Sequence, residues 1–411
     1  MNSKNIVILG TLDTKGEHLH LLKKCIEGRG HKAVILDLSM GATPAYPADI
    51  PAAEIARIAG YGMEKLIAAR NRSASAEVMT AGAQQKVLDL LARKEIDGIV
   101  AMGGSSMALI GQRVMSKLPF GIPKVIATPA AMPTYISEWF GSLDVVIMQV
   151  IMEFAGMHHL LSAVIAQVAG AISGMVEESL DYHSLRLPYP SVAITQISFN
   201  EGCASQVKML LEEKGYHVYP FHANGISDRS MERLIGQGFL DGLIDIVPAG
   251  LIEELFQGNR AAGMERLDAP IDRGMPLVLA PSTFNVTGAG PTRRMRDRFI
   301  DRRPRLQIDE IRFMTRYSPD EMRQGARLYA EKLNRAKGPI KLLVPLRGWS
   351  NIDKPGSVLY NPEEDQVFMN ELKARLTREI DIEEFDCNLE DPEFARALVE
   401  SFDEIFKKVR G

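Results

Sequence analysis

Residues 8–18, ILGTLDTKGEH, contain the first side chains in the chain that could bind a ligand. They supply a small residue, two hydroxyls, a carboxylate and an ammonium group: Gly10, Thr11, Thr14, Asp13 and Lys15. The P-loop pattern G-x-x-x-x-G-K-[ST] is absent, because Lys15 precedes Gly16 and Glu17 stands where the hydroxyl belongs. A lysine at a helix start is unfavourable unless an anion neutralises it. We expect phosphate contact here, with Asp13 as a cap or a Mg²⁺ ligand; a capped turn with a solvated lysine is the alternative.

A second candidate loop, GGSSM, lies between the apolar run 98–102 and a helical segment. Glycines and serines at a helix start can present backbone N–H groups to an anion. An ordinary serine cap on a tight turn is the alternative. Another apolar run, PKVIATP, ends near a threonine that we expect to join the same pocket. The residues expected to bind the cofactor in this part of the site are Gly103, Gly104, Ser105, Ser106 and Thr128.

The second half of the chain offers acid, base and cation side chains after its own apolar runs. Glu201 and His222 are the candidates for moving a proton, although a single histidine is more often structural. Such a set suits a small metabolite that carries a carboxylate or a phosphate. The residues expected to bind this substrate are Asn200, Asn224, Gly225, Arg229, Arg347, Ser350 and Asp353.

The elements that must position these residues are short apolar runs alternating with segments of helical period. This alternation is typical of α/β folds, and it predicts two Rossmann-like, doubly wound domains with mainly parallel sheets. The halves resemble each other at three successive places: GHKAVI and GYHVYPF, DGIVAM and DGLIDI, PKVIATP and PLVLAP. We expect domains at 1–185 and 190–411, because Pro188 and Pro190 interrupt a long helical segment. Ligands should bind beyond the carboxyl ends of the strands and in the cleft between the domains.

Length and composition limit the class of protein. The 411 residues exceed what one core usually supports, and 46% hydrophobic with 24% charged residues is typical of a globular chain. A net charge of −4 gives no reason to expect nucleic-acid binding. Three scattered cysteines suit a reducing cytoplasm, and the opening apolar run is too short for a signal peptide. No apolar run approaches the roughly 20 residues of a membrane helix, so we expect a cytoplasmic protein without membrane contact.

Five motifs spread along nearly the whole chain carry a resemblance: GTLDTK, GGSS, FHANGISDRSME, RFMTR and PLRGWSNIDKPGSVLYNPEED. Through them the chain resembles the ATP-binding domain family of the tomato mosaic virus resistance protein and its bacterial relatives. The resemblance implies two Rossmann-like domains, binding of ATP with Mg²⁺, and self-association. It also implies a TIM-barrel enzyme as a partner. This chain differs from the family pattern at residues 200–202, where Thr-Thr-Pro is usual, and at His158, where Asn is usual.

Three functions fit these patterns. The first is a nucleotide-binding protein whose first-half loops hold a triphosphate. The second is an enzyme that acts on a small carboxylate- or phosphate-bearing metabolite in the cleft, with or without ATP. The third is a regulatory module without chemistry, because the sequence alone identifies no nucleophile–base pair.

Overall fold

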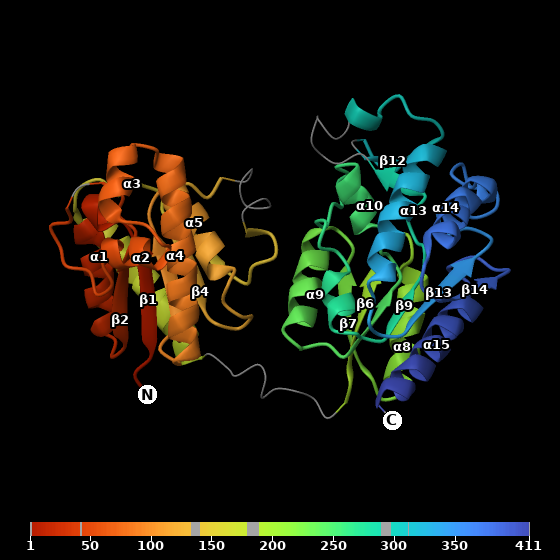
Figure 1. Ribbon diagram of the computed structural model, residues 1–411, viewed down its shortest axis with the longest axis horizontal. Coiled ribbons are helices and arrows are strands. Elements are labelled where there is room, and N and C mark those ends of the chain that lie inside the picture. Colours follow the sequence, from red (N-terminus) through yellow and green to blue (C-terminus); the bar gives the residue numbers. More distant parts are fainter. Residues whose placement is uncertain are drawn as a thin grey trace. The chain divides into compact units, whose positions relative to one another are not determined.

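The computed structural model describes residues 2–41, 43–132, 140–178, 189–288, 297–310 and 312–410. The chain divides into two compact units, Met1–Ser184 and Leu185–Gly411, each with its own sheets (Figure 1). The expected boundary at Pro188 lies outside the described residues.

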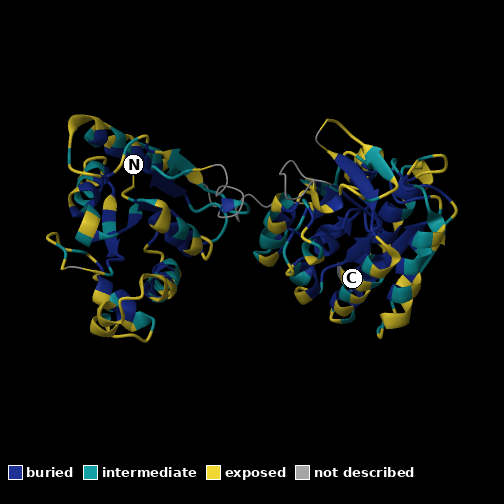
Figure 2. Cartoon of the chain, turned by 90° about the horizontal axis from the view of Figure 1, so that it is seen from above, coloured by how far each residue is buried: buried dark blue, intermediate teal, exposed yellow. Residues whose placement is uncertain are grey.

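Unit 1 is built on a five-stranded parallel sheet in the order β2-β1-β3-β4-β5. Its strands are β1 (Asn5–Gly10), β2 (Lys32–Asp37), β3 (Gly98–Met102), β4 (Lys124–Thr128) and β5 (Val146–Gln149). In β1, Ile6 and Ile8 belong to one core and Val7 and Leu9 to another, because successive side chains alternate between faces. Burial on both faces explains why the strands are continuous apolar runs (Figure 2).

Helices cover both faces of this sheet. One face carries α1 (Leu12–Glu27) and α7 (His159–Glu177), which pack against each other. The other face carries α2 (Ala52–Ile58), α3 (Met63–Ala69), α4 (Arg72–Ala92) and α5 (Ser105–Met115).

Helix α7 corrects one expectation about the sequence. It is long and apolar enough, by length and composition alone, to cross a membrane. Its buried residues recur with helical spacing, as Leu161, Ile165, Val168 and Ile172 do, and they pack into the core that α1 and the sheet share. Within the described residues, this helix fits a core element of an α/β sheet.

Unit 2 contains a six-stranded parallel sheet in the order β14-β13-β9-β8-β6-β7. Its strands are β6 (Ser191–Gln196), β7 (His217–His222), β8 (Gly242–Asp245), β9 (Leu277–Leu279), β13 (Ile340–Pro345) and β14 (Asp381–Phe385). One face carries α8 (Glu201–Glu213) and α15 (Pro392–Arg410). The other face carries α9 (Ile226–Gly236), α10 (Gly250–Leu255), α11 (Asp268–Asp272), α13 (Pro319–Asn334) and α14 (Pro362–Arg375).

A small antiparallel sheet is added to unit 2. It has the order β10-β12-β11 and consists of β10 (Val286–Gly288), β11 (Arg305–Gln307) and β12 (Phe313–Arg316). Phe313 and Met314 of the expected run IRFM thus lie in a strand, but this strand pairs outside the parallel sheet.

The two parallel sheets share one topology. We number the strands of each parallel sheet in chain order. Across the sheet of unit 2, from β7 to β14, the order is then 2-1-3-4-5-6. Across the sheet of unit 1, from β2 to β5, it is 2-1-3-4-5. The three sequence similarities between the halves fall on equivalent strands: β2 and β7, β3 and β8, β4 and β9. In such sheets the strand order reverses between the first and third strands, where ligands usually bind. We call this point the crossover point; it lies between β1 and β3 in unit 1 and between β6 and β8 in unit 2.

Candidate functional site

The backbone N–H groups at the start of α1, just after β1, are already hydrogen-bonded within unit 1. The N–H of Leu12 donates to Asp37 Oδ1 and the N–H of Asp13 donates to Ser39 Oγ, both at 3.0 Å. The next two N–H groups of α1 donate to the carbonyl oxygen of Thr11 at 3.3 and 2.9 Å. Because all four N–H groups of this first turn have partners, contact with a ligand here must come from side chains.

Contacts within unit 1 account for both Lys15 and Gly10. Lys15 Nζ donates to the carbonyl oxygen of Phe154 at 2.6 Å, and its non-helical backbone kinks the start of α1. A Cβ atom on Gly10 would lie 2.5 Å from the Cδ atoms of Leu19, so the close approach of α1 to the sheet accounts for this glycine.

A pocket of about 390 Å³ lies beside this loop, and Thr11, Asp13 and Thr14 line it. The two threonine hydroxyls are 2.8 Å apart. The lining also includes polar residues from the end of α3 and the start of α4 that sequence reasoning missed: Arg70, Asn71, Arg72 and Ser75. Two guanidinium groups near hydroxyls suit an anionic oxygen. The run ARNRS, two arginines around a helix cap, was the signal in the sequence.

The backbone at Arg70 is unusual for its residue type. Arg70 ends α3 in the left-handed region, with φ +47° and ψ +23°, where glycine or asparagine is usual. The next residue, Asn71, caps α4 by accepting from the N–H of Ala74 at 3.1 Å. Glycine would be less strained than arginine at this position, and the exposed side chain of Arg70 lines the pocket.

The second expected loop leaves β3, the neighbour of β1, at the same edge of the sheet. Gly103 is buried against Met107, whereas a Cβ on Gly104 would meet nothing within 4 Å. Gly104 caps α5 without a side-chain hydrogen bond, and Ser105 and Ser106 are exposed. Among the described residues, no hydrogen-bond partner is found for the N–H groups of 104–107. The start of α5 therefore keeps the donors that the start of α1 has used.

Thr128 is buried at the end of β4, where its Oγ1 accepts from the N–H of Ala130 at 3.2 Å. It stabilises the turn that follows the strand. It is not among the described residues that line the 390 Å³ pocket.

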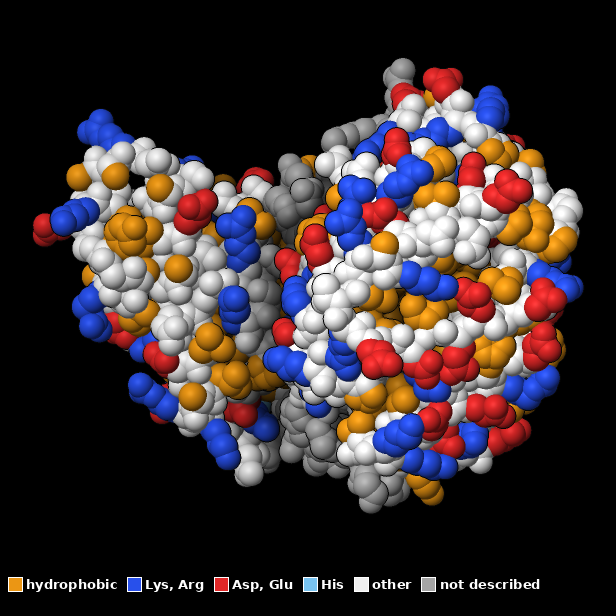
Figure 3. Space-filling model, turned by 45° about the vertical axis from the view of Figure 1, so that its right-hand side comes forward, with side chains coloured by type: hydrophobic (Ala, Val, Ile, Leu, Met, Phe, Trp, Pro, Cys, Tyr) orange, Lys and Arg blue, Asp and Glu red, His pale blue; other side chains and the backbone are white. Residues whose placement is uncertain are grey.

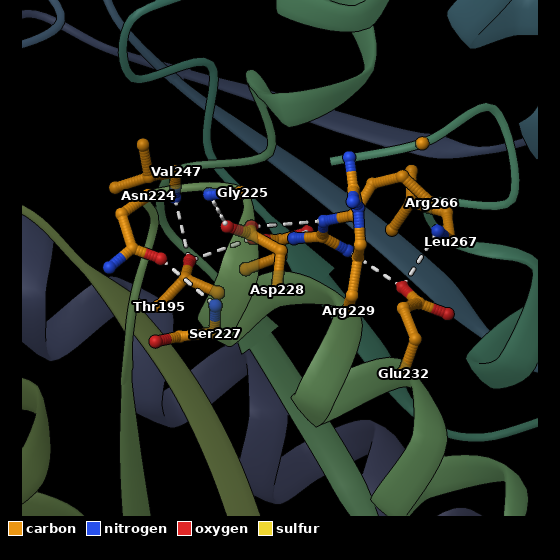
Figure 4. Close-up of polar contacts among 12 residues, drawn as sticks. Thr195, Asn224, Gly225, Ser227, Asp228, Arg229, Glu232, Val247, Arg266 and Leu267 are labelled. Atoms are coloured by element: carbon orange, nitrogen blue, oxygen red, sulfur yellow. Dashed lines mark hydrogen bonds and ion pairs between the residues drawn. The ribbon is translucent and has the colours of Figure 1, made fainter. Parts of the chain in front are cut away.

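At the crossover point of unit 2 a buried ion network takes the space (Figure 4). Arg266 is fully buried and donates to Asp245 at 2.6 Å, to Glu232 at 3.0 Å and to Asp228 at 3.2 Å. Thr195, at the end of β6, donates to Asp245 at 2.7 Å. Neither Arg266 nor its three carboxylates were among the expected site residues, although Asp228 and Glu232 lie within the motif FHANGISDRSME.

Burial sets the pKa values in this network. It raises the pKa of Asp245 and of Glu232, in both cases against the effect of Arg266. For Arg266, burial alone would lower the pKa, but Asp245, Asp228 and Glu232 outweigh it and raise the pKa. The arginine thus stays charged and donates hydrogen bonds to all three carboxylates.

The start of α8 in unit 2 already binds a carboxylate. The N–H of Cys203 donates to Glu390 Oε1 at 3.2 Å, and a Cβ on Gly202 would collide with this carboxylate. Burial raises the pKa of Glu390, although its hydrogen bonds oppose the shift. Asn200 is buried at the N-cap position of α8 without a side-chain bond to the helix, and its Oδ1 accepts from the N–H of Ile197. Glu201 is exposed.

The expected residues after β7 are separated by the structure. His222 and Asn224 are exposed and line a second pocket, described below. Gly225 has φ +86°, and a Cβ there would lie 2.4 Å from the carbonyl oxygen of Ala261. Arg229 is exposed and donates to that same carbonyl at 3.1 Å.

The expected residues after β13 lie in two environments. Exposed Arg347 is paired with Asp386 at 2.6 and 2.8 Å, which raises the pKa of Arg347. Ser350 is buried and donates to Asp353 Oδ1 at 3.0 Å. Asp353 also accepts from Asn285, whose Nδ2 donates to Asp365 at 3.0 Å.

This second buried network is closed by Arg316, which donates to Asp365 Oδ1 at 2.6 Å. Burial raises the pKa of Asp365 to about 7, with Arg316 opposing the shift, and burial also raises the pKa of Asp353. The long loop after β13 is therefore held down by buried polar contacts, and its specific motif has a structural explanation.

The second pocket, of about 300 Å³, lies where β6 and β7 end, against the small sheet. Besides His222 and Asn224, its polar lining includes Asn259 and Arg260. Arg260 is 7% exposed, and it pairs with buried Glu253 at 2.5 Å. Sequence reasoning missed both residues, since GNRA lies in an unremarkable loop.

Cys387, Asp391 and Glu393 are the one group of possible metal ligands within the described residues, with ligand atoms within 4.8 Å of one another. Burial raises the pKa of Cys387 to about 12, which disfavours the thiolate that a metal requires.

Family comparisons match both units. The N-terminal domain of the Uncharacterised protein family (UPF0261) matches residues 4–181, and its C-terminal domain matches residues 189–406. This chain belongs to that family. A UPF0261 protein of Clostridium tetani is 32% identical over 99% of this chain and 100% of its own length. The ToMV resistance protein Tm-1(GCR237) of Solanum lycopersicum is 30% identical over 77% of this chain and 42% of its own length.

Solved structures give much weaker likenesses. A UDP-GlcNAc 2-epimerase of Methanocaldococcus jannaschii, in complex with UDP-GlcNAc and UDP, is 10% identical over 99% of this chain and 94% of that chain, with a TM-score of 0.22. A likeness at this level carries no argument about the ligand.

Proposed function

We propose that unit 1 binds a nucleotide such as ATP, with its phosphates in the pocket beside α1 and α4. The observation that carries the proposal is the gathering of Arg70 and Arg72 in one pocket with Thr11 and Thr14. Guanidinium groups and hydroxyls are the side chains that bind phosphate oxygens. The volume of about 390 Å³ is within the range of small-ligand sites. The start of α5 follows the adjacent strand, and its N–H groups, which have no partner within the described residues, would supply further donors.

Asp13 fits the role of the Mg²⁺ ligand. It lines the pocket, it is only partly buried, and its Oδ2 lies toward Gly41, where a Cβ would be 3.0 Å away. Mg²⁺ usually takes one or two protein carboxylates, with water and phosphate oxygens as its other ligands. Asp13 would hold the ion, which would neutralise charge on the phosphates. Lys15 is held by Phe154 and would act at longer range.

Thermal unfolding of the full chain with and without ATP·Mg²⁺ tests the proposal. A ligand that binds only the folded state must raise the melting temperature. Arg70→Gly is the most informative variant, because glycine suits the left-handed backbone at this position. It should keep or raise the melting temperature of the free protein and weaken the ATP-induced shift. Arg72→Ala should weaken the shift too, and Asp13→Asn should remove its dependence on Mg²⁺.

Arg93→Ala is the matched control. Arg93 is exposed and caps the far end of α4, roughly 30 Å from Arg72 along the helix. It should leave the shift unchanged. If ATP·Mg²⁺ fails to shift the wild type, or if Arg70→Gly and Arg93→Ala respond alike, the nucleotide assignment is wrong. Self-association and a TIM-barrel partner stay predictions from the resemblance.

A further inference from the structure

We propose a second ligand site, in unit 2, that binds a small organic anion through Arg260 and Asn259. This inference does not depend on nucleotide binding in unit 1. The site is the pocket of about 300 Å³ at the ends of β6 and β7. Its position beyond the carboxyl ends of parallel strands is the one that ligands prefer in this topology.

The guanidinium of Arg260 is the main evidence for this site, because only some of its N–H groups have hydrogen-bond partners among the described residues. Nε and Nη2 donate to Glu253 Oε1 at 3.1 and 2.5 Å, and Nη2 also donates to the carbonyl oxygen of Val286 at 3.1 Å. Nη1, which has two N–H groups, is buried without a hydrogen-bond partner among the described residues. A buried donor without a partner destabilises the folded protein, so a ligand oxygen that accepts from Nη1 would bind favourably.

The neighbouring residue supplies the opposite kind of group. Asn259 also lines the pocket, and its Oδ1 is buried without a partner among the described residues. Two adjacent residues that line the pocket thus carry, within the described residues, an unused donor and an unused acceptor. A ligand that satisfies both has an anionic oxygen for Arg260 and a hydroxyl or amine donor for Asn259.

The rest of the lining defines the remainder of the ligand. The side chains of Phe199, Phe313 and Met314 make part of the lining apolar, and the last two belong to β12 of the small sheet. His222 and Asn224 are exposed where β7 ends, so they contribute polar groups at the solvent side. The chemistry that fits is a hydroxy- or amino-substituted carboxylate or phosphate ester with a short carbon chain.

Calorimetric titration of the full chain distinguishes the two anions. The probes are glycerate, which has a carboxylate and hydroxyls, and glycerol 3-phosphate, which has a phosphate and hydroxyls. Acetate and glycerol each lack one of the two required groups and serve as reference compounds. We expect at least one of the two probes to bind about tenfold more tightly than both reference compounds. Glycerate alone would identify the anion as a carboxylate, and glycerol 3-phosphate alone as a phosphate; either supports the site.

Variants then locate the binding. Arg260→Lys keeps a positive charge next to Glu253 but removes Nη1, and it should weaken binding about tenfold. Asn259→Asp places a like charge beside the anion and should weaken binding at least as much. Arg323→Lys, the same change at an exposed arginine paired with Asp320, should have no effect. The ATP-induced shift of unit 1 should be unchanged in all three, so a failure here is separable from a failure of the nucleotide proposal.

Two results would overturn the inference. One is that neither probe binds at millimolar concentration. The other is that a probe binds equally well to the wild type and to Asn259→Asp, which decides the matter even if Arg260→Lys does not fold.

Discussion

Units 1 and 2 have the same strand order through their first five strands, but the space at their crossover points is filled differently. In unit 1 the strands β1 and β3 lead into Gly10 and Gly103, and the helix start after β3 keeps its N–H donors. In unit 2 the equivalent point contains Arg266 with three carboxylates, and the carboxylate of Glu390 occupies the start of α8.

The difference teaches that one topology can leave the N–H donors after its third strand free, within the described residues, or fill the equivalent point with its own side chains. In unit 2 the carboxylate of Glu390 lies at the start of α8, in the place that a ligand anion would take at a helix start. Surface charge does not separate the units in the same way. Lys and Arg side chains are interspersed with Asp and Glu on the face seen in Figure 3, in line with the net charge of −4.

The largest effect is expected from Arg266→Met. It leaves Asp228, Asp245 and Glu232 buried without their cation, and the loss of one partner from a buried ion pair costs about 3–5 kcal/mol. Urea unfolding of the full chain measures the loss. Arg375→Ala, which removes an exposed pair with Glu371, is the control and should leave the transition nearly unchanged. Equal effects of the two substitutions would show that the network does not hold unit 2 together.

A pH effect is expected from the second buried network of unit 2. The folded pKa of Asp365, about 7, exceeds the ordinary value of about 3.9 in an unfolded chain. Protonation therefore favours the folded state, and this contribution to stability is complete below pH 4 or so and is lost as the pH rises to about 7. Asp365→Asn should remove that slope, up to about 1.4 kcal/mol per pH unit, from urea unfolding measured between about pH 4 and pH 8.

The matched control for this pH experiment is Asp386→Asn, which removes the exposed partner of Arg347. It should leave the dependence on pH as in the wild type. A slope that survives in Asp365→Asn would assign the titration to another group.

A smaller effect is expected from Glu390→Ala, which should free N–H donors at the start of α8, like those at the start of α5 within the described residues. Removal of the carboxylate from the start of α8 should lower the free energy of unfolding by about 1 kcal/mol. It should also create a sulfate-binding position, detected as a larger stabilisation by sulfate than in the wild type. Glu400→Ala, an exposed change on α15, is the control. If sulfate stabilises both variants equally, the start of α8 is not a latent anion site.

The smallest effect on stability is expected from Ser105→Pro. Proline suits the first position of a helix, and Gly104 before it already has an extended backbone, with φ −71° and ψ −171°. The substitution removes one N–H donor from the start of α5, and Ser105→Ala keeps that donor while removing the hydroxyl. If the helix start contacts the phosphates, Ser105→Pro should weaken the ATP-induced thermal shift more than Ser105→Ala does. An identical shift in both variants would confine the nucleotide to the pocket beside α1.

The sequence by itself determined the class of fold, because strands buried on both faces must be continuous apolar runs and their crossover helices must be amphipathic. The three similarities between the halves likewise predicted equivalent strands correctly. The sequence also placed Thr11, Asp13 and Thr14 at a strand end that borders a pocket. These patterns are local, because they depend only on residues that are close together in the sequence.

Only the tertiary structure decided which polar groups remain available. Lys15 is bound by Phe154, Asp353 by Asn285, and the start of α8 by Glu390, partners that are 68 to 187 residues distant in the chain. Folding brings Arg70 and Arg72 into one pocket with Thr11 and Thr14, and Arg260 into one pocket with His222. A hydrogen bond or ion pair depends on distance in space, and the spacing of residues along a chain does not fix that distance.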